Sequence, residues 1–271
     1  MRKPESARLA WAAGFMIVAG LSAMPGPAQI GAPPASPAPD GLRAGTGAPF
    51  AKGHHAALDQ LPDLGGIWFL TFDRAAGPAP KPRLKGSYKA AYDAWLEEVR
   101  ANHGETKSDS SHCSPPGMPM FMQIPQYPME FLLTPGRVTI NAEAWMQTRS
   151  IWTDGRAHPA DPDPSFAGDS IGHWEKGTLV VDTVAIKSSL ALAMGMTHSD
   201  KLRITERIGL KPGQPDILVD EMVLTDPDAL EEPFRVTTTY RRDRYGKLLE
   251  FECAENDRNP VDAKGDTRFD P

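Results

Sequence analysis

The sequence predicts a mainly β protein, either a single antiparallel β-barrel or a β-sandwich, with about ten strands and one substantial helix. Three observations support this prediction. Apolar and polar residues alternate with a period of two along most of the chain beyond residue 129, as in strands that bury one face. Turns that contain Gly, Pro or Asp separate these segments. Helical spacing of apolar residues extends over only one long segment, residues 86–104.

The N-terminal part of the chain is expected to lie outside the folded domain. An apolar run from Leu9 to Ala23 follows a few basic residues. This run is too short to span a bilayer comfortably, so residues 1–28 predict a cleaved export signal, with an uncleaved anchor helix as the alternative. Residues 29–61 are rich in Ala, Pro and Gly without a hydrophobic period, and they predict a disordered tether. A single domain then covers residues 62–271, in the periplasm or outside the cell.

The elements of this domain follow from local patterns. Residues 63–73 predict a first strand, and residues 86–104 predict a helix with Ser87 as its N-cap and an aromatic stripe that packs on the body. The later strands are expected over residues 129–133, 137–152, 169–175, 178–186, 200–210, 216–226, 234–243 and 248–256. A barrel of the lipocalin type is preferred, because such a meander closes its own edges and leaves an interior.

Charge and cysteine content restrict the expected partners and compartment. The net charge is −6 and the sequence has no basic stripe, so no binding to nucleic acid is expected, and no membrane contact is expected after removal of the signal. Cys113 and Cys253 fit an oxidising compartment and predict one disulfide, with two free buried thiols as the alternative. Such a bridge closes a loop of about 140 residues, and the chain-entropy model predicts that it stabilises the folded protein by about 4–5 kcal/mol. The oligomeric state is left open.

Residues 168–172, Gly-Asp-Ser-Ile-Gly, match the G-x-S-x-G pattern of serine hydrolases. A nucleophile elbow needs a buried strand before the serine and a helix after it, because the strained turn exposes the hydroxyl. Here a Pro-rich loop precedes Ser170, and a β-hairpin with a Lys-Gly turn follows it. The pattern therefore does not predict a nucleophile, and its glycines are expected to let a strand bend.

Polar side chains on the apolar face of a strand are better candidates for a site. Period-two alternation over residues 198–208 places Glu206 among inward-facing apolar residues, on the same side as His198 and Asp200. A buried carboxylate is costly unless it has a partner or is neutral. Glu206 is therefore expected to be paired or to have a raised pKa.

Two further carboxylates are expected to face inward. Asp182 and Glu221 each stand between valines two positions away on either side. Arg149, which follows Glu143 closely in the sequence, is available as a partner for one of the inward carboxylates. An Arg–Glu pair with a purely structural role is the alternative interpretation of Glu206.

Two functions of different classes fit this pattern. In the first, the protein is a cofactor-independent enzyme of the lyase, isomerase or dehydratase type, acting on a small, largely apolar molecule. His198 and Glu206 would transfer protons, and Asp200 would orient the imidazole. His158, on a loop at a strand end, is a further catalytic candidate. In the second, the protein is a non-catalytic carrier or scavenger, whose polar residues only satisfy one another.

The walls of the same interior are expected to bind the ligand. Trp174, Trp145 and the Met-rich residues 118–129 supply apolar surface. The polar candidates for ligand binding are Asp182, Glu143 and Arg149. No cofactor is predicted, although a divalent metal is a weaker alternative. Its ligand set would be His158, His198, Asp200 and Glu206.

Several motifs together resemble those of a family of exported, β-rich bacterial proteins. The family commonly shows TP-x-R-V-x-I, DGR-x-HP, G-x-S-x-G-x-WE-x-x-TLVVDT and H-[ST]-[DE]-x-L-x-x-x-ER segments, followed by a late Cys. The matching segments are residues 134–140, 154–159, 168–183 and 198–207, ahead of Cys253. The resemblance supports the disulfide, but it departs at Ala185-Ile186, where the family usually has Gly-Phe, and it implies no particular reaction. The resemblance marks five residues as positions that belong to the motifs of the family: His158, Trp174, Asp182, His198 and Glu206.

Overall fold

The structure, a computed structural model, describes residues 57–71, 80–103 and 113–253, except residues 125 and 194. The predicted signal peptide, residues 1–28, lies outside the described residues. Of the predicted tether only residues 57–61 are described, and they contain one 3-10 turn, η1 (Leu58–Gln60). No helix within the described ranges is long and apolar enough to cross a membrane.

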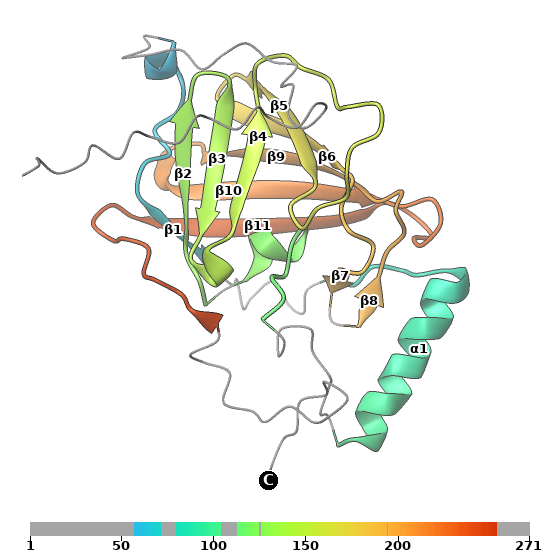
Figure 1. Cartoon of the computed structure of the whole chain (residues 1–271). Coiled ribbons are helices and arrows are strands. Elements are labelled where there is room, and N and C mark those ends of the chain that lie inside the picture. The colour runs from blue at the N-terminus through green and yellow to red at the C-terminus, as the bar shows by residue number, and fades with distance from the viewer. Residues whose placement is uncertain (1–56, 72–79, 104–112, 125, 194, 254–271) are drawn as a thin grey trace, which may run out of the picture. The chain divides into compact units, whose positions relative to one another are not determined.

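Nine strands form a closed barrel, which confirms the prediction of a mainly β barrel with one substantial helix (Figure 1). Around the barrel the strands follow the order β1-β11-β10-β9-β6-β5-β4-β3-β2. Their bounds are β1 (Ile67–Thr71), β2 (Met129–Thr134), β3 (Arg137–Ala142), β4 (Thr148–Trp152), β5 (Asp169–Glu175), β6 (Thr178–Val184), β9 (Arg203–Lys211), β10 (Gln214–Thr225) and β11 (Phe234–Asp243).

The barrel departs from the antiparallel expectation at one pair of strands. β4 and β5 are parallel, with Ile151 opposite Ser170. Their connection, residues 153–168, therefore returns along the barrel before β5 begins, because parallel neighbours need a crossover. This connection is visible on one side of the barrel in Figure 1. A separate two-stranded sheet is formed by β7 (Ala191–Ala193) and β8 (Met196–Thr197).

Two predicted strands differ in the structure. Residues 137–152 form β3 and β4 with the short helical turn η5 (Ala144–Met146) between them, so one predicted strand is a hairpin. The strand predicted over residues 248–256 is wrong for its described part, because residues 248–253 form no strand.

Helix α1 (Gly86–Ala101) is present, but its start and its packing differ from the prediction. Lys85, not Ser87, is the N-cap residue, and no side chain caps the helix. No residue of α1 is fully buried. Tyr88 and Tyr92 pack against the core as half-buried side chains, so the aromatic stripe contacts the body only in part.

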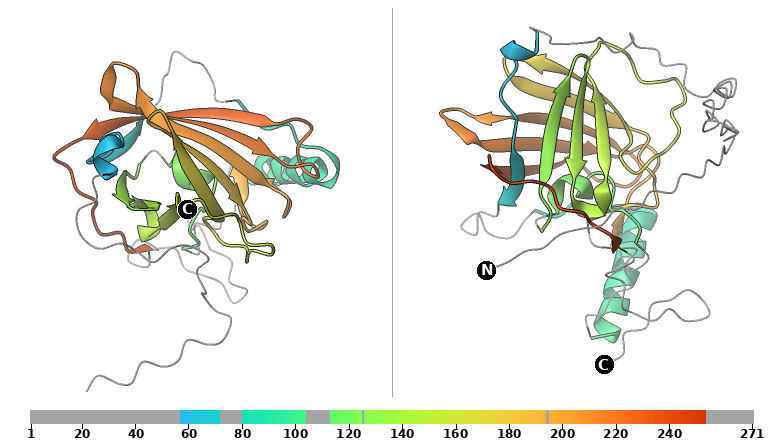
Figure 2. Two further views of the ribbon diagram at one scale, coloured as in Figure 1. Left: turned by 90° about the horizontal axis from the view of Figure 1, so that it is seen from above. Right: turned by 60° about the vertical axis from the view of Figure 1, so that its left-hand side comes forward.

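A methionine-rich turn enters the barrel and forms its plug. This turn contains η4 (Met120–Gln123) and is the green coil inside the ring of strands in the left view of Figure 2. The side chains of Met118, Phe121 and Met122 are at most 2% exposed and belong to the single hydrophobic core. We call residues 118–123 the plug. The Tyr240 hydroxyl fixes it by donating a hydrogen bond of 2.5 Å to the carbonyl oxygen of Met122.

The predicted disulfide between Cys113 and Cys253 is confirmed. It joins the chain just before the plug to the segment that follows β11, across 140 positions of sequence. No other cysteine is present in the sequence. The bridge therefore links the two ends of the segment that builds most of the barrel.

Candidate functional site

A fully buried ion pair lies in the barrel interior. Arg149 on β4 bonds to Glu206 on β9 through both terminal nitrogens, with 2.9 Å between Nη1 and Oε1. Its Nη2 also donates to the Thr183 hydroxyl at 2.9 Å, and the Ser170 hydroxyl lies 3.3 Å from its Nε. We call these four residues the Arg149 cluster. The predicted inward orientation of Glu206, and Arg149 as partner of an inward carboxylate, are confirmed.

Ser170 has a structural environment. It lies within β5 and is 1% exposed, and its hydroxyl is 2.9 Å from that of Thr183. A strand continues after it, so the strand–turn–helix geometry of a nucleophile elbow is absent at this position. Gly168 has a φ of +70°, and an added Cβ would lie 2.6 Å from the carbonyl oxygen of Val184. Gly168 therefore allows the chain at the start of β5 to approach β6 closely.

Asp220 is an interior carboxyl that the sequence pattern did not reveal. It lies on β10, is fully buried, and neither of its side-chain oxygens has a hydrogen-bond partner in the described part of the chain. Burial raises the pKa of Asp220 well above its usual range, and the nearby charge of Glu206 raises it further. The expectation for Glu221 is wrong, because Glu221 is exposed on the opposite face of the same strand.

The raised pKa of Asp220 predicts a pH-dependent stability. The folded protein holds the proton to a higher pH than the unfolded chain, so the stability from this group is complete below the ordinary pKa of aspartate and declines as pH rises through the folded pKa. Asp220→Asn should therefore match the wild type near pH 3 and exceed it at pH 7. Urea denaturation from pH 3 to pH 8 measures this difference. Glu221→Gln, an exposed change on the same strand, should give no such divergence.

Asp182 and His158 come together on the outside of the barrel. The alternate residues Leu179 and Val181 are buried, whereas Asp182 lies on the outer face, so its predicted inward orientation is wrong. The imidazole of His158 lies between two carboxylates, with Nδ1 2.5 Å from Asp169 and Nε2 3.2 Å from Asp182. Arg203 also bonds to Asp182. These contacts fasten the connection 153–168 to the wall of the barrel.

His198 and Asp200 do not form the expected group with Glu206. β9 begins at Arg203, and residues 198–202 form no strand and include a turn at residues 200 and 201, so the alternation of the strand does not extend back to them. Asp200 is exposed, which contradicts its predicted inward position. His198 is buried, and its Nδ1 lies 2.7 Å from the Ser199 carbonyl oxygen. Burial lowers the pKa of His198, which favours a neutral imidazole.

The expected aromatic walls lie in two different places. Trp174 is half-buried and packs against the core from β5. Trp145 lies in η5, where its ring is 5.1 Å from that of Phe251 and 6.2 Å from that of Tyr127. Glu143, next to this turn, accepts a hydrogen bond of 2.7 Å from the backbone nitrogen of Leu249. Trp145 and Glu143 therefore contact residues 249–251, which follow β11.

The residues of the alternative metal site bond to different partners and do not share a ligand position. Glu206 bonds to Arg149, His158 to two outer carboxylates, and His198 to a backbone oxygen. Within the described ranges, no group of three or more His, Cys, Asp or Glu side chains is arranged to hold a metal ion.

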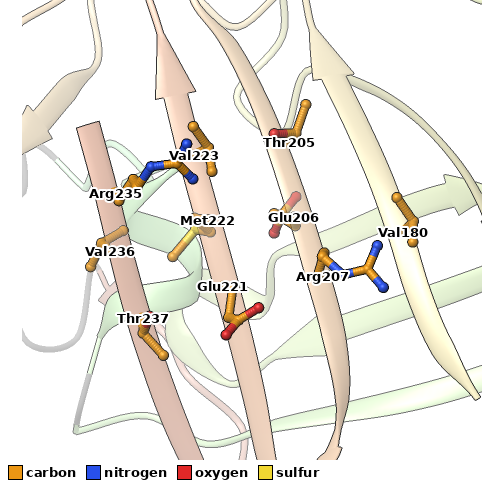
Figure 3. Close-up of a pocket in the computed structure, with 10 residues that line it drawn as sticks. All are labelled: Val180, Thr205, Glu206, Arg207, Glu221, Met222, Val223, Arg235, Val236 and Thr237. Carbon is orange, nitrogen blue, oxygen red and sulfur yellow. The ribbon is translucent and has the colours of Figure 1, made fainter. Parts of the chain in front are cut away.

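A shallow groove crosses the outer face of β6, β9, β10 and β11. Its volume is about 450 Å³, and Val180 and Val223 contribute its apolar floor. Figure 3 shows Arg207 extending toward Val180 and Arg235 extending toward Val223. The charged side chains of Arg207, Glu221 and Arg235 line the groove, in contrast with the apolar interior of the barrel.

Comparison with models of known families, with curated proteins and with solved structures found no match for this chain. The chemistry of the interior and of the outer face is therefore the basis for any functional assignment.

Proposed function

We propose that this is an exported protein that binds a small, largely apolar molecule in the interior of its barrel without transforming it. The observation that carries this proposal is the set of flexible methionine side chains in the core. Met118 and Met122 come from the plug, and Met129 and Met222 from β2 and β10. All four are at most 2% exposed and belong to one hydrophobic cluster.

Methionine suits an adaptable apolar site. Its unbranched side chain has several rotatable bonds and a polarisable sulfur, so it can repack around a guest at low cost. The barrel fold favours an interior guest, because the closed sheet provides a continuous wall. The disulfide is compatible with an oxidising compartment outside the cytoplasm. Binding is therefore proposed to displace the side chains of the plug.

The Arg149 cluster supports binding over acid–base catalysis. A general base must reach the substrate proton, and Glu206 instead uses both oxygens for Arg149. His198 bonds through Nδ1 to the Ser199 carbonyl oxygen, and no hydrogen bond joins it to Glu206 within the described residues. The carrier hypothesis expects this arrangement, in which interior polar groups satisfy one another.

The proposal can be tested with N-phenyl-1-naphthylamine, a neutral apolar dye that fluoresces in apolar surroundings. The folded protein should bind it saturably, and Met122→Ala should bind it several-fold more tightly, because the truncation opens space in the core. Val223→Arg, which fills the outer groove, should leave the affinity unchanged. Absence of saturable binding in both the wild type and Met122→Ala would contradict the proposal, and loss of binding in Val223→Arg would move the site to the groove.

A further inference from the structure

Asp220 differs from the Arg149 cluster and from Tyr240 in the barrel interior. The members of the Arg149 cluster bond to one another, and the Tyr240 hydroxyl donates to the plug. Both oxygens of Asp220 are buried without a hydrogen-bond partner in the described residues. Buried polar groups in folded proteins nearly always have a partner, because an unmatched group loses its bonds to water and gains nothing. The carboxyl of Asp220 therefore indicates a missing partner.

This carboxyl lies next to the point where the plug is held. Asp220 on β10 is directly opposite Thr238 on β11. The Thr238 hydroxyl bonds at 3.0 Å to the Tyr240 hydroxyl, which in turn holds Met122. Met222, the next inward residue of β10 after Asp220, belongs to the same hydrophobic cluster as the methionines of the plug. A guest that displaces the methionines would therefore come within reach of Asp220.

The state of Asp220 defines the group that it can recognise. Burial and the charge of Glu206 raise its pKa, whereas the charge of Arg149 lowers it, and the net shift favours the protonated carboxyl, which has one O–H to donate. The complementary group on the guest is an acceptor. A charged acceptor would lose its hydration inside the barrel at high cost, whereas an uncharged carbonyl loses little.

We propose that Asp220 donates a hydrogen bond to an uncharged carbonyl oxygen of the bound molecule. The ligand class is then a neutral, compact ketone, aldehyde or ester with an apolar body. This inference rests on the proposed function, because it places the guest in the barrel interior beside the plug.

Two probes that differ only in the carbonyl test the inference. 1-Indanone and indane share one bicyclic body, and both can be measured by displacement of N-phenyl-1-naphthylamine at pH 6. Asp220→Leu should lower the ratio of indanone affinity to indane affinity about tenfold, since one hydrogen bond is lost. Asp220→Asn keeps an N–H donor and should retain most of the preference. Glu221→Gln, on the outer face of the same strand, should behave as the wild type.

A second measurement does not depend on a stable variant. The C=O stretch of isotope-labelled indanone bound to the wild type should lie at lower wavenumber than in cyclohexane, because a hydrogen bond weakens the carbonyl bond. An unshifted stretch, or an affinity ratio in Asp220→Leu equal to that of the wild type, overturns the inference and leaves the proposed function standing. If neither probe nor the dye binds, the proposed function itself fails.

Discussion

Replacing Arg149 with methionine is expected to lower the free energy of unfolding by about 3–5 kcal/mol. The guanidinium is completely buried, and it compensates the equally buried carboxylate of Glu206. Without it, Glu206 must either carry an unpaired charge in the core or take up a proton. Urea denaturation at pH 7 measures the loss.

The double variant Arg149→Met, Glu206→Leu distinguishes the destabilisation caused by an unpaired buried charge from the net contribution of the ion pair to the free energy of unfolding. Replacing a buried ion pair with apolar residues is often neutral or stabilising. The hydroxyls of Ser170 and Thr183 keep each other as partners at 2.9 Å, so the double variant should recover most of the stability. Arg203→Met is the matched control, because Arg203 pairs with Asp182 while its side chain is 56% exposed. That change should cost about 0–1 kcal/mol.

Removal of the disulfide should produce the second large effect. The bridge spans 140 positions, and the chain-entropy model gives about 5 kcal/mol for a loop of that length. Cys113→Ser, Cys253→Ser should therefore unfold at a clearly lower urea concentration than the oxidised wild type.

Reduction provides the control for this effect. Dithiothreitol should bring the wild type to the stability of the double variant and should leave the variant unchanged. Equal stability of the oxidised wild type and the variant would mean that strain in the bridged chain, or structure in the unfolded chain, cancels the entropic gain.

The positions of most strands could be predicted from the sequence. Which face of a strand points inward could be predicted only where the apolar residues occupy one face and the polar residues the other. On β9 the residues opposite the apolar set are Arg and Thr, so Glu206 was placed correctly. On β10 both faces carry apolar side chains, and an acidic residue occupies each face at Asp220 and Glu221. Alternation cannot choose between such faces. The prediction selected Glu221, and the barrel buries Asp220.

The same ambiguity explains Asp182, and a second limit explains the histidines. β6 has valine on both faces, with Val180 and Val184 on the outer side beside Asp182 and Val181 on the buried side. The expected grouping of His198 with Glu206 assumed that a strand began at residue 198, whereas β9 begins at Arg203. Contacts such as that between Arg149 and Glu206 join positions 57 residues apart, and only the closed barrel defines which candidates meet.

The closure of the barrel has a consequence for biosynthesis. β1 pairs with β11 along its whole length, from Ile67 opposite Asp243 to Thr71 opposite Thr239. Of the described barrel strands, β1 is therefore synthesised first, and it gains this neighbour only when β11, the last of them, has been made. Contacts of such long sequence separation form slowly, and the waiting edge is open to wrong pairing. Until β11 is available, this edge of β1 has no neighbour.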